Sequence, residues 1–282
     1  MVKYAMYSCT QKIEIKFSKL FLFNFNLLIP VPLDARNLEI EGFEKEGQMV
    51  RDDIKKCNWL LLSGKKKSFE KFVKVNYRIK QLLNKPDIKD YLNVSNDPAE
   101  IRLISHDNRD LKEISTWLKR DNPSISIYVE RVIEYLTENL IYSTNPKSRV
   151  ASEVSKSKKS DCGGYHSLLC ALLRVNHIPA IIDNGYRIDT GGPHVWAWWY
   201  NKENKRWNMV DINDFQKGSK SISPRISFGL GLGISNTPKE LLIPSRVKRR
   251  VSFIQSFCAY PTYRLIKLQS VFNAQVLIRR NR

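Results

Sequence analysis

The stretch SDCGGYHSLLCALLR, residues 160–174, decides the fold, because a cysteine stands where a polar turn becomes an amphipathic segment. Ser160 or Asp161 is a suitable N-cap, which predicts Cys162 in the first turn of a helix. The backbone N–H groups and the helix dipole favour an anion there, so we expect a lowered thiol pKa and a nucleophilic sulfur. A lone cysteine is more often a bystander, so this interpretation needs a base elsewhere in the chain.

The helix that begins at Cys162 is predicted to end near Asn176, because Pro179 prevents its continuation. Its apolar face consists of Tyr165, Leu168, Leu169 and Leu172. Cys170 lies on or beside that face, so we interpret it as a structural residue. Three strand-like segments follow, at residues 180–188, 194–200 and 206–212.

A candidate base lies in HVWAWWYNKENKRWNMVDIND, residues 194–214, which has the pattern of a β-hairpin. If the polar residues 201–204 form the loop, counting outward places His194 opposite Asp211 on one face of the sheet. The carboxylate could then hold the imidazole in one tautomer. A loop one residue shorter or longer would spoil this pairing. The predicted catalytic residues are therefore Cys162, His194 and Asp211.

Three more residues are assigned to substrate binding. Trp196 is two residues from His194 and could wall the site, although core packing is the ordinary role of such a side chain. Gly192, in the turn before His194, could let a substrate approach closely, and an ordinary turn explains it equally well. Gly163, next to Cys162, is the third.

The other three histidines are weaker candidates. His166 shares the helix of Cys162, and its ring would point back along the helix surface. His177 ends that helix, and His106 belongs to a loop before another helix. With four histidines and five cysteines that form no CxxC pair, the sequence offers little to a zinc site, so we expect no metal and no cofactor.

The period of the apolar residues divides the chain into three parts. Residues 1–92 alternate as strands do and predict an N-terminal β-rich unit. Residues 93–216 change to a helical period, most clearly at 125–141, and then carry the site. Residues 217–282 form a basic C-terminal extension that could complete the core sheet. The fold class expected is α+β.

Net charge, hydropathy and the number of cysteines indicate which partners and which cellular compartment to expect. The formal net charge of +19 favours an acidic partner, although a solvated lysine-rich surface accounts for it as well. The apolar run at 20–33 is too short and interrupted to span a bilayer, and we expect no signal peptide. The odd number of cysteines favours a reducing compartment. We therefore expect a soluble, cytoplasmic protein.

Residues 149–188, followed by HVWAWWY and RWNMVDIND, resemble the transglutaminase-like superfamily. The resemblance covers roughly residues 98–214 and implies a papain-like core with a helix-borne cysteine packed on an antiparallel sheet. It also implies a cysteine, a histidine in an HxW strand and an aspartate ending a WxxxD strand, here Cys162, His194 and Asp211. Ser160 and Asn213 depart from the residues common in the family, and neither departure removes a catalytic atom.

The chemistry implied is acyl transfer from a peptide or carboxamide, with a peptide or protein as substrate. Water as acceptor gives a protease or amidase, and an amine gives a transamidase; the sequence does not decide between them. The alternative is a non-catalytic basic module that docks an acidic protein or nucleic acid, the latter not favoured. RVKRR at 246–250 and IRRNR at 278–282 would then carry the binding.

Overall fold

The computed structural model describes residues 3–17, 23–32, 35–41, 47–52, 57–66, 69–82, 98–218, 225–230, 258–260 and 265–281. The chain divides into two compact units. We call the first the β unit (residues 1–84, 185–193 and 224–282) and the second the core unit (residues 85–184 and 194–223). The basic segment 246–250 lies outside the described residues.

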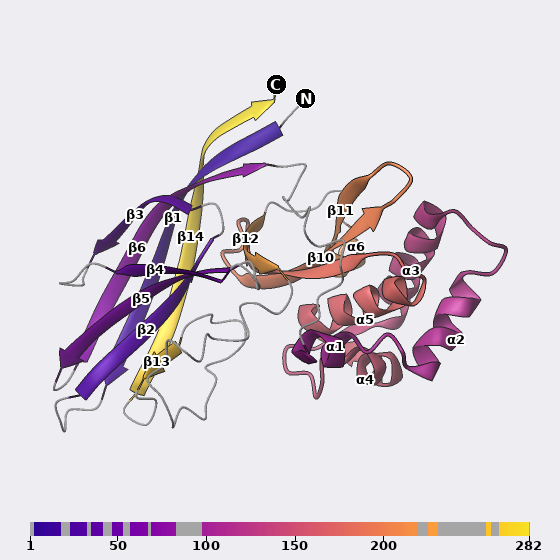
Figure 1. Ribbon diagram of the computed structural model, residues 1–282, viewed down its shortest axis with the longest axis horizontal. Coiled ribbons are helices and arrows are strands. Elements are labelled where there is room, and N and C mark those ends of the chain that lie inside the picture. The colour runs from indigo at the N-terminus through magenta and orange to yellow at the C-terminus, as the bar shows by residue number, and fades with distance from the viewer. Residues whose placement is uncertain are drawn as a thin grey trace. The chain divides into compact units, whose positions relative to one another are not determined.

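The β unit contains two groups of paired strands (Figure 1). One sheet has the order β14-β1-β6-β3, made of β1 (Lys3–Phe17), β3 (Ala35–Glu41), β6 (Phe69–Leu82) and β14 (Leu265–Asn281). The other group has the order β12-β5-β2-β13, with β4 also paired to β5. Its members are β2 (Phe23–Val31), β4 (Gln48–Asp52), β5 (Cys57–Lys66), β12 (Arg225–Leu230) and β13 (Cys258–Tyr260).

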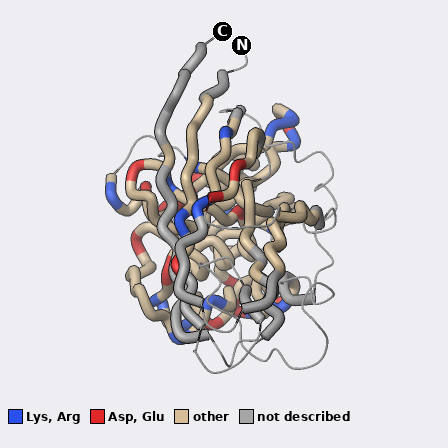
Figure 2. The backbone as a smooth tube through the Cα atoms, turned by 90° about the vertical axis from the view of Figure 1, so that its left-hand side faces the viewer, with Lys and Arg blue, Asp and Glu red and all other residues tan. Residues whose placement is uncertain are grey.

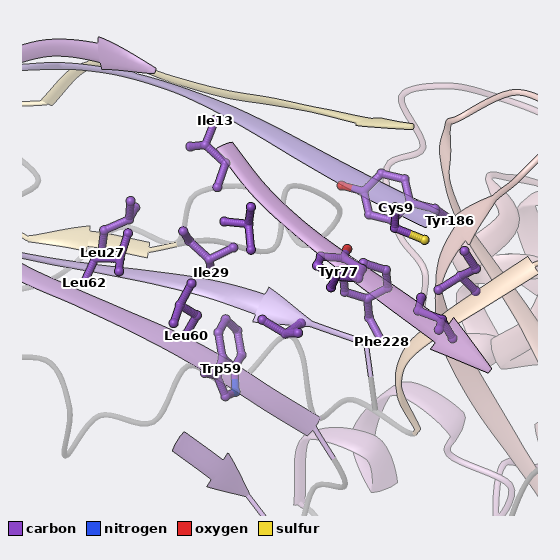
Figure 3. Packing of buried hydrophobic residues seen from close by; sticks show 14 of the residues in the cluster. Cys9, Ile13, Leu27, Ile29, Trp59, Leu60, Leu62, Tyr77, Tyr186 and Phe228 are labelled. Carbon is purple, nitrogen blue, oxygen red and sulfur yellow. The ribbon is translucent and has the colours of Figure 1, made fainter. Parts of the chain in front are cut away.

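Alternation of apolar and polar residues builds the core of the β unit. On β6, Val75, Tyr77 and Ile79 are buried, as their alternation with polar residues predicts. They pack with residues of β1, β2, β5 and β12 in one apolar cluster, which includes Ile13 and Trp59 (Figure 3). Charged residues stay at the surface: Lys74 Nζ lies 3.0 Å from Glu41 Oε1. Figure 2 shows acidic residues among the basic ones along the described trace.

The C-terminal strand belongs to the β unit. β14 runs antiparallel to β1 from the pair Lys3 and Asn281 to the pair Phe17 and Leu265. That residues 217–282 form an extension of their own, and that they complete the core sheet, stay predictions. β6 pairs with one edge of β1, and β14 supplies the hydrogen-bonding partners that the backbone of the other edge needs.

The core unit is built around one buried helix. Its helices are α1 (Pro98–Ile104), α2 (Arg109–Leu118), α3 (Ile125–Asn139), α4 (Ala151–Ser157), α5 (Cys162–Val175) and α6 (Ile212–Gln216). The other five helices all contact α5, and every residue of α5 from Cys162 to Arg174 is buried. α3 buries Val129, Val132 and Leu136 towards this centre, as its helical period predicts.

The strands of the core unit are β7 (Ile141–Tyr142), β8 (Lys159–Ser160), β9 (Ala180–Arg187), β10 (Pro193–Asn201) and β11 (Arg206–Val210). β11, β10 and β9 are neighbours in that order, and the last residues of β9 and the first of β10 are counted with the β unit. The helix-and-antiparallel-sheet arrangement confirms the expected α+β class. No helix among the described ranges is both long and apolar enough to cross a membrane.

The β10–β11 hairpin is real, but its predicted register is wrong by two residues. Its loop comprises residues 202–205, and Ala197 pairs with Val210. Asn201 extends β10 by one residue because its side chain accepts the N–H of Glu203, at 2.8 Å, and thereby closes the turn. A shift of two preserves the face of every side chain, so His194 and Asp211 remain on the same side of the sheet.

Candidate active site

Cys162 is the first residue of α5, as the sequence predicts. Asp161 is the N-cap, and its Oδ1 accepts a hydrogen bond from the backbone N–H of Gly164 at 3.2 Å. The thiol is thereby fixed in the first turn, where the helix dipole favours negative charge. Cys162 is only 4% exposed.

Arg149 holds the capping carboxylate from the other side. Its Nε donates to both carboxylate oxygens of Asp161, at 2.9 and 2.8 Å, and Nη2 donates to Oδ2. These hydrogen bonds raise the pKa of Arg149, with burial acting in the opposite direction. A carboxylate that both caps the helix and binds a guanidinium has little freedom, so the first turn of α5 is rigid.

The expected lowering of the thiol pKa is wrong for this structure. The pKa of Cys162 is raised to about 12, mainly by burial and next by the charge of Asp161. Asp211 also raises it, whereas the backbone N–H groups of Val195 and Gly163 lower it. Desolvation therefore has a larger effect on the thiol pKa than the helix N-terminus. A buried thiolate loses more stabilisation from water than the hydrogen bonds from these N–H groups supply. At neutral pH the group is a thiol and needs a base.

His194 and Asp211 form a close buried pair. His194 Nε2 lies 2.6 Å from Asp211 Oδ2, with side-chain exposures of 9% and 0%. Asp211 Oδ1 accepts the backbone N–H of Asn213 at 2.9 Å, which makes Asp211 the N-cap of α6. Because an ionised carboxylate only accepts hydrogen bonds, His194 Nε2 carries the proton in the neutral ring, and Nδ1 is left as the basic atom.

The thiol lies beside the strand of this pair. The backbone N–H of Val195, which follows His194 in β10, hydrogen-bonds to Cys162 and lowers its pKa. In the described part of the chain, no hydrogen bond occupies His194 Nδ1. The arrangement brings a thiol, an imidazole and a carboxylate from α5, β10 and the end of β11 to one region of the core unit.

His166 is the residue whose part in the site the sequence reasoning missed. Its Nε2 accepts the backbone N–H of Ile212 at 3.2 Å, so Nδ1 carries the proton and donates to the carbonyl of Cys162 at 2.7 Å. This neutral ring is 0% exposed, and Nε2 lies 3.6 Å from Asp211 Oδ1. The available signal was its position four residues after the cysteine, on the same helix face.

The predicted substrate-binding residues have different environments. Trp196 is 1% exposed and stacks on His194 with ring centroids 6.5 Å apart, which suits it to hold the imidazole in place. Gly163 is buried, and a Cβ there would lie 2.9 Å from Arg149 Cδ. Gly192 is in the β9–β10 turn, where its N–H bonds to Thr190 Oγ1 at 3.2 Å. Substrate contact by these residues stays a prediction.

The remaining candidates lie as expected. His177 follows α5 and is exposed, His106 lies between α1 and α2, and Cys170 is fully buried within α5. Cys9, Cys162 and Cys170 are free cysteines. Across the described ranges, no group of three or more His, Cys, Asp or Glu side chains is placed to hold a metal ion.

Comparison with known proteins agrees with the fold. Residues 114–212 match the family model described as the transglutaminase-like superfamily. The chain is similar to a solved structure named "Putative Cysteine Protease from Cytophaga hutchinsonii", with a TM-score of 0.63 and 11% identity, over 99% of this chain and 94% of that one. At this identity the likeness shows a shared fold.

Another solved structure, named a "TGase", has a TM-score of 0.32 and 19% identity, over 56% of this chain and 45% of that one. No curated protein matches the chain in sequence.

Proposed function

The chain carries a transglutaminase-like core at residues 114–212, and we propose that it is a cysteine-dependent acyl-transfer enzyme acting on a peptide or carboxamide. The observation that supports this most is the contact between His194 Nε2 and Asp211 Oδ2, which lie 2.6 Å apart. The Cys162 thiol is next to this pair, because it accepts a hydrogen bond from the backbone N–H of Val195. A packed structural histidine would need no carboxylate partner and no neighbouring thiol.

The first step forms an acyl-enzyme. His194 Nδ1 accepts the thiol proton while Cys162 Sγ attacks the carbonyl carbon, and a C–S bond forms as the carbonyl π electrons move to oxygen. The backbone N–H of Cys162, at the start of α5, stabilises that oxyanion. Collapse of the intermediate breaks the C–N bond, and the leaving amine takes the proton from His194.

The second step releases the acyl group. Water or an amine attacks the thioester carbon and gives its proton to His194; the C–S bond then breaks, and the sulfur recovers the proton from His194. Asp211 stabilises the imidazolium in both steps. We propose water as the default acceptor, because it is always present. A reducing compartment such as the cytoplasm would keep the thiol active.

The test is direct trapping of the acyl-enzyme. The protein is mixed with a p-nitrophenyl ester, and intact mass and peptide mapping locate the acyl group. We expect one acyl group on Cys162, none on the Cys162→Ala variant, and much slower acylation of His194→Ala. Added putrescine then tells a transferase from a hydrolase, since it would leave as the acylated amine. Equal acylation of wild type and Cys162→Ala contradicts the proposal.

A further inference from the structure

The short strand β7 lies beside the catalytic helix, and among the described residues no strand pairs with one of its two edges. β7 runs parallel to β8, and Tyr142 pairs with Ser160, two residues before Cys162. The N–H groups of Ile141 and Ser143 donate to the carbonyls of Lys158 and Ser160, both at 2.8 Å. Within the described part of the chain, β8 is the only strand paired with β7.

The backbone of Tyr142 therefore points away from β8. Successive residues of a strand direct their N–H and C=O groups to opposite edges, and the residues on either side of Tyr142 use theirs towards β8. An edge that presents an N–H and a C=O in this way is a template for an added extended chain.

The side chains of β7 are apolar and unusually exposed. Ile141 is 66% exposed and Tyr142 is 49% exposed. The Tyr142 ring packs edge-on against Tyr165 of α5, with centroids 6.1 Å apart, so it has a fixed support. Burial raises the pKa of Tyr142, and the ionised form of Cys162 and the charge of Asp161 act in the same direction.

We infer that β7 binds the acyl-donor peptide in extended form, with a large apolar side chain beside the reacting carbonyl packed on Tyr142. The peptide backbone bonds to the N–H and C=O of Tyr142, as an added strand does. The occupant is an acyl donor because Tyr142 pairs with Ser160, which is two residues before the nucleophile Cys162. A peptide bound along β7 can therefore reach the sulfur within one or two peptide units. This inference rests on the proposed function, which supplies the nucleophile.

The chemistry of the surface favours an apolar partner over an acidic one. Arg149, the cation whose charge acts on the Tyr142 phenol, already binds both carboxylate oxygens of Asp161. An acidic substrate residue at this arginine would therefore have to compete with a partly buried ion pair, whereas an apolar one covers the exposed ring of Tyr142.

The test uses peptidyl vinyl sulfones that differ only in the residue beside the warhead: glycine, leucine or phenylalanine. Each labels Cys162 by conjugate addition, and iodoacetamide measures the reactivity of the thiol without a peptide. We expect the leucine and phenylalanine probes to label the wild type about tenfold faster than the glycine probe. Tyr142→Ala should lose this preference, and Tyr142→Phe should keep it. Trp117→Ala is the matched control, since Trp117 is an exposed aromatic that contacts Tyr135 and Arg120.

Binding without reaction separates this inference from the proposed function. Fluorescent peptide amides with the same three residues are titrated into Cys162→Ala and into Cys162→Ala/Tyr142→Ala by anisotropy. Tighter binding of the phenylalanine peptide to the first protein alone supports the β7 site even if no probe reacts. Equal binding of the glycine and phenylalanine peptides to both proteins, or an iodoacetamide rate that falls in Tyr142→Ala as much as the probe rates do, overturns it.

Discussion

His166 Nε2 accepts the backbone N–H of Ile212 at 3.2 Å, which joins the helix of Cys162 to the turn of Asp211. The same ring donates from Nδ1 to the carbonyl of Cys162. One neutral, fully buried imidazole therefore fixes the spacing between the nucleophile's helix and the carboxylate that holds His194.

Replacing His166 by alanine should destabilise the core unit by about 1–3 kcal/mol, because a buried N–H at Ile212 loses its acceptor. Urea unfolding measures the loss, and His177→Ala, at an exposed position after α5, is the control. We also expect slower alkylation of Cys162, since Asp211 loses a fixed neighbour. If His166→Ala has the same free energy of unfolding and the same alkylation rate of Cys162 as the wild type, the ring does not fix the position of Asp211 or of α5.

Replacing Asp161 by asparagine should lower the pKa of Cys162. The charge of Asp161 is the second cause of the raised thiol pKa, after burial, and asparagine retains the N-cap oxygen. The rate of iodoacetamide alkylation should therefore rise at about pH 8–9 relative to wild type. Asp107→Asn, an exposed carboxylate paired with Lys112, is the control. An unchanged dependence of the alkylation rate on pH would show that the charge of Asp161 does not raise the pKa of the Cys162 thiol.

The raised pKa of Cys162 predicts alkaline destabilisation. The folded state keeps the thiol proton up to about pH 12, whereas the ordinary thiol pKa of 9.0 applies to an unfolded chain. Between these values the unfolded state binds fewer protons, so the contribution of Cys162 to stability is complete below about pH 9 and is lost as pH rises. The slope approaches 1.4 kcal/mol per pH unit at most.

Urea unfolding at several alkaline pH values checks this sign. The stability of wild type relative to Cys162→Ala should shrink as pH rises, because the variant has no proton to lose there. A difference between the two proteins that stays constant or grows from about pH 8 to pH 11 would mean that the thiol is not protonated in the folded state.

Much of the site follows from local sequence rules. The cap at Asp161 and the place of Cys162 need only neighbouring residues, and the pairing of His194 with Asp211 needs only the period of a strand. The predicted register was wrong, yet His194 and Asp211 still lie on the same face of the sheet. The reason is that the observed loop, 202–205, shifts the strand pairing by an even number of residues.

Other features depend on contacts that no local pattern carries. The sign of the thiol pKa shift comes from the burial of Cys162, which the helix-dipole argument does not contain. His166 became part of the site because Ile212, far along the chain, brings its N–H to the ring. The pairing of β14 with β1 joins opposite ends of the sequence, and the alternation of apolar residues within a strand does not indicate which strand it pairs with.

Gly164 should not tolerate a side chain. A Cβ there would lie 1.9 Å from Ser160 Oγ and 2.6 Å from Ser160 Cβ, so Gly164→Ala forces a shift between β8 and α5. We expect a loss of roughly 1–3 kcal/mol in the free energy of unfolding. The double variant Ser160→Gly/Gly164→Ala should recover part of it.

Gly192→Ala is the comparison for this variant, because its nearest contact would be Thr190 Oγ1 at 3.3 Å. Its cost should be clearly smaller than that of Gly164→Ala. Equal costs at both positions, or no recovery in the double variant, would contradict the packing described around Ser160.

The most direct test is the rate at which iodoacetamide alkylates Cys162 at about pH 7 in wild type, His194→Ala, Asp211→Asn and the double variant. If the three side chains act as one unit, each single variant loses most of the rate, by about 100-fold or more, and the double variant loses little beyond that. Alkylation that is equally fast in wild type and His194→Ala would show that the imidazole takes no proton from the sulfur.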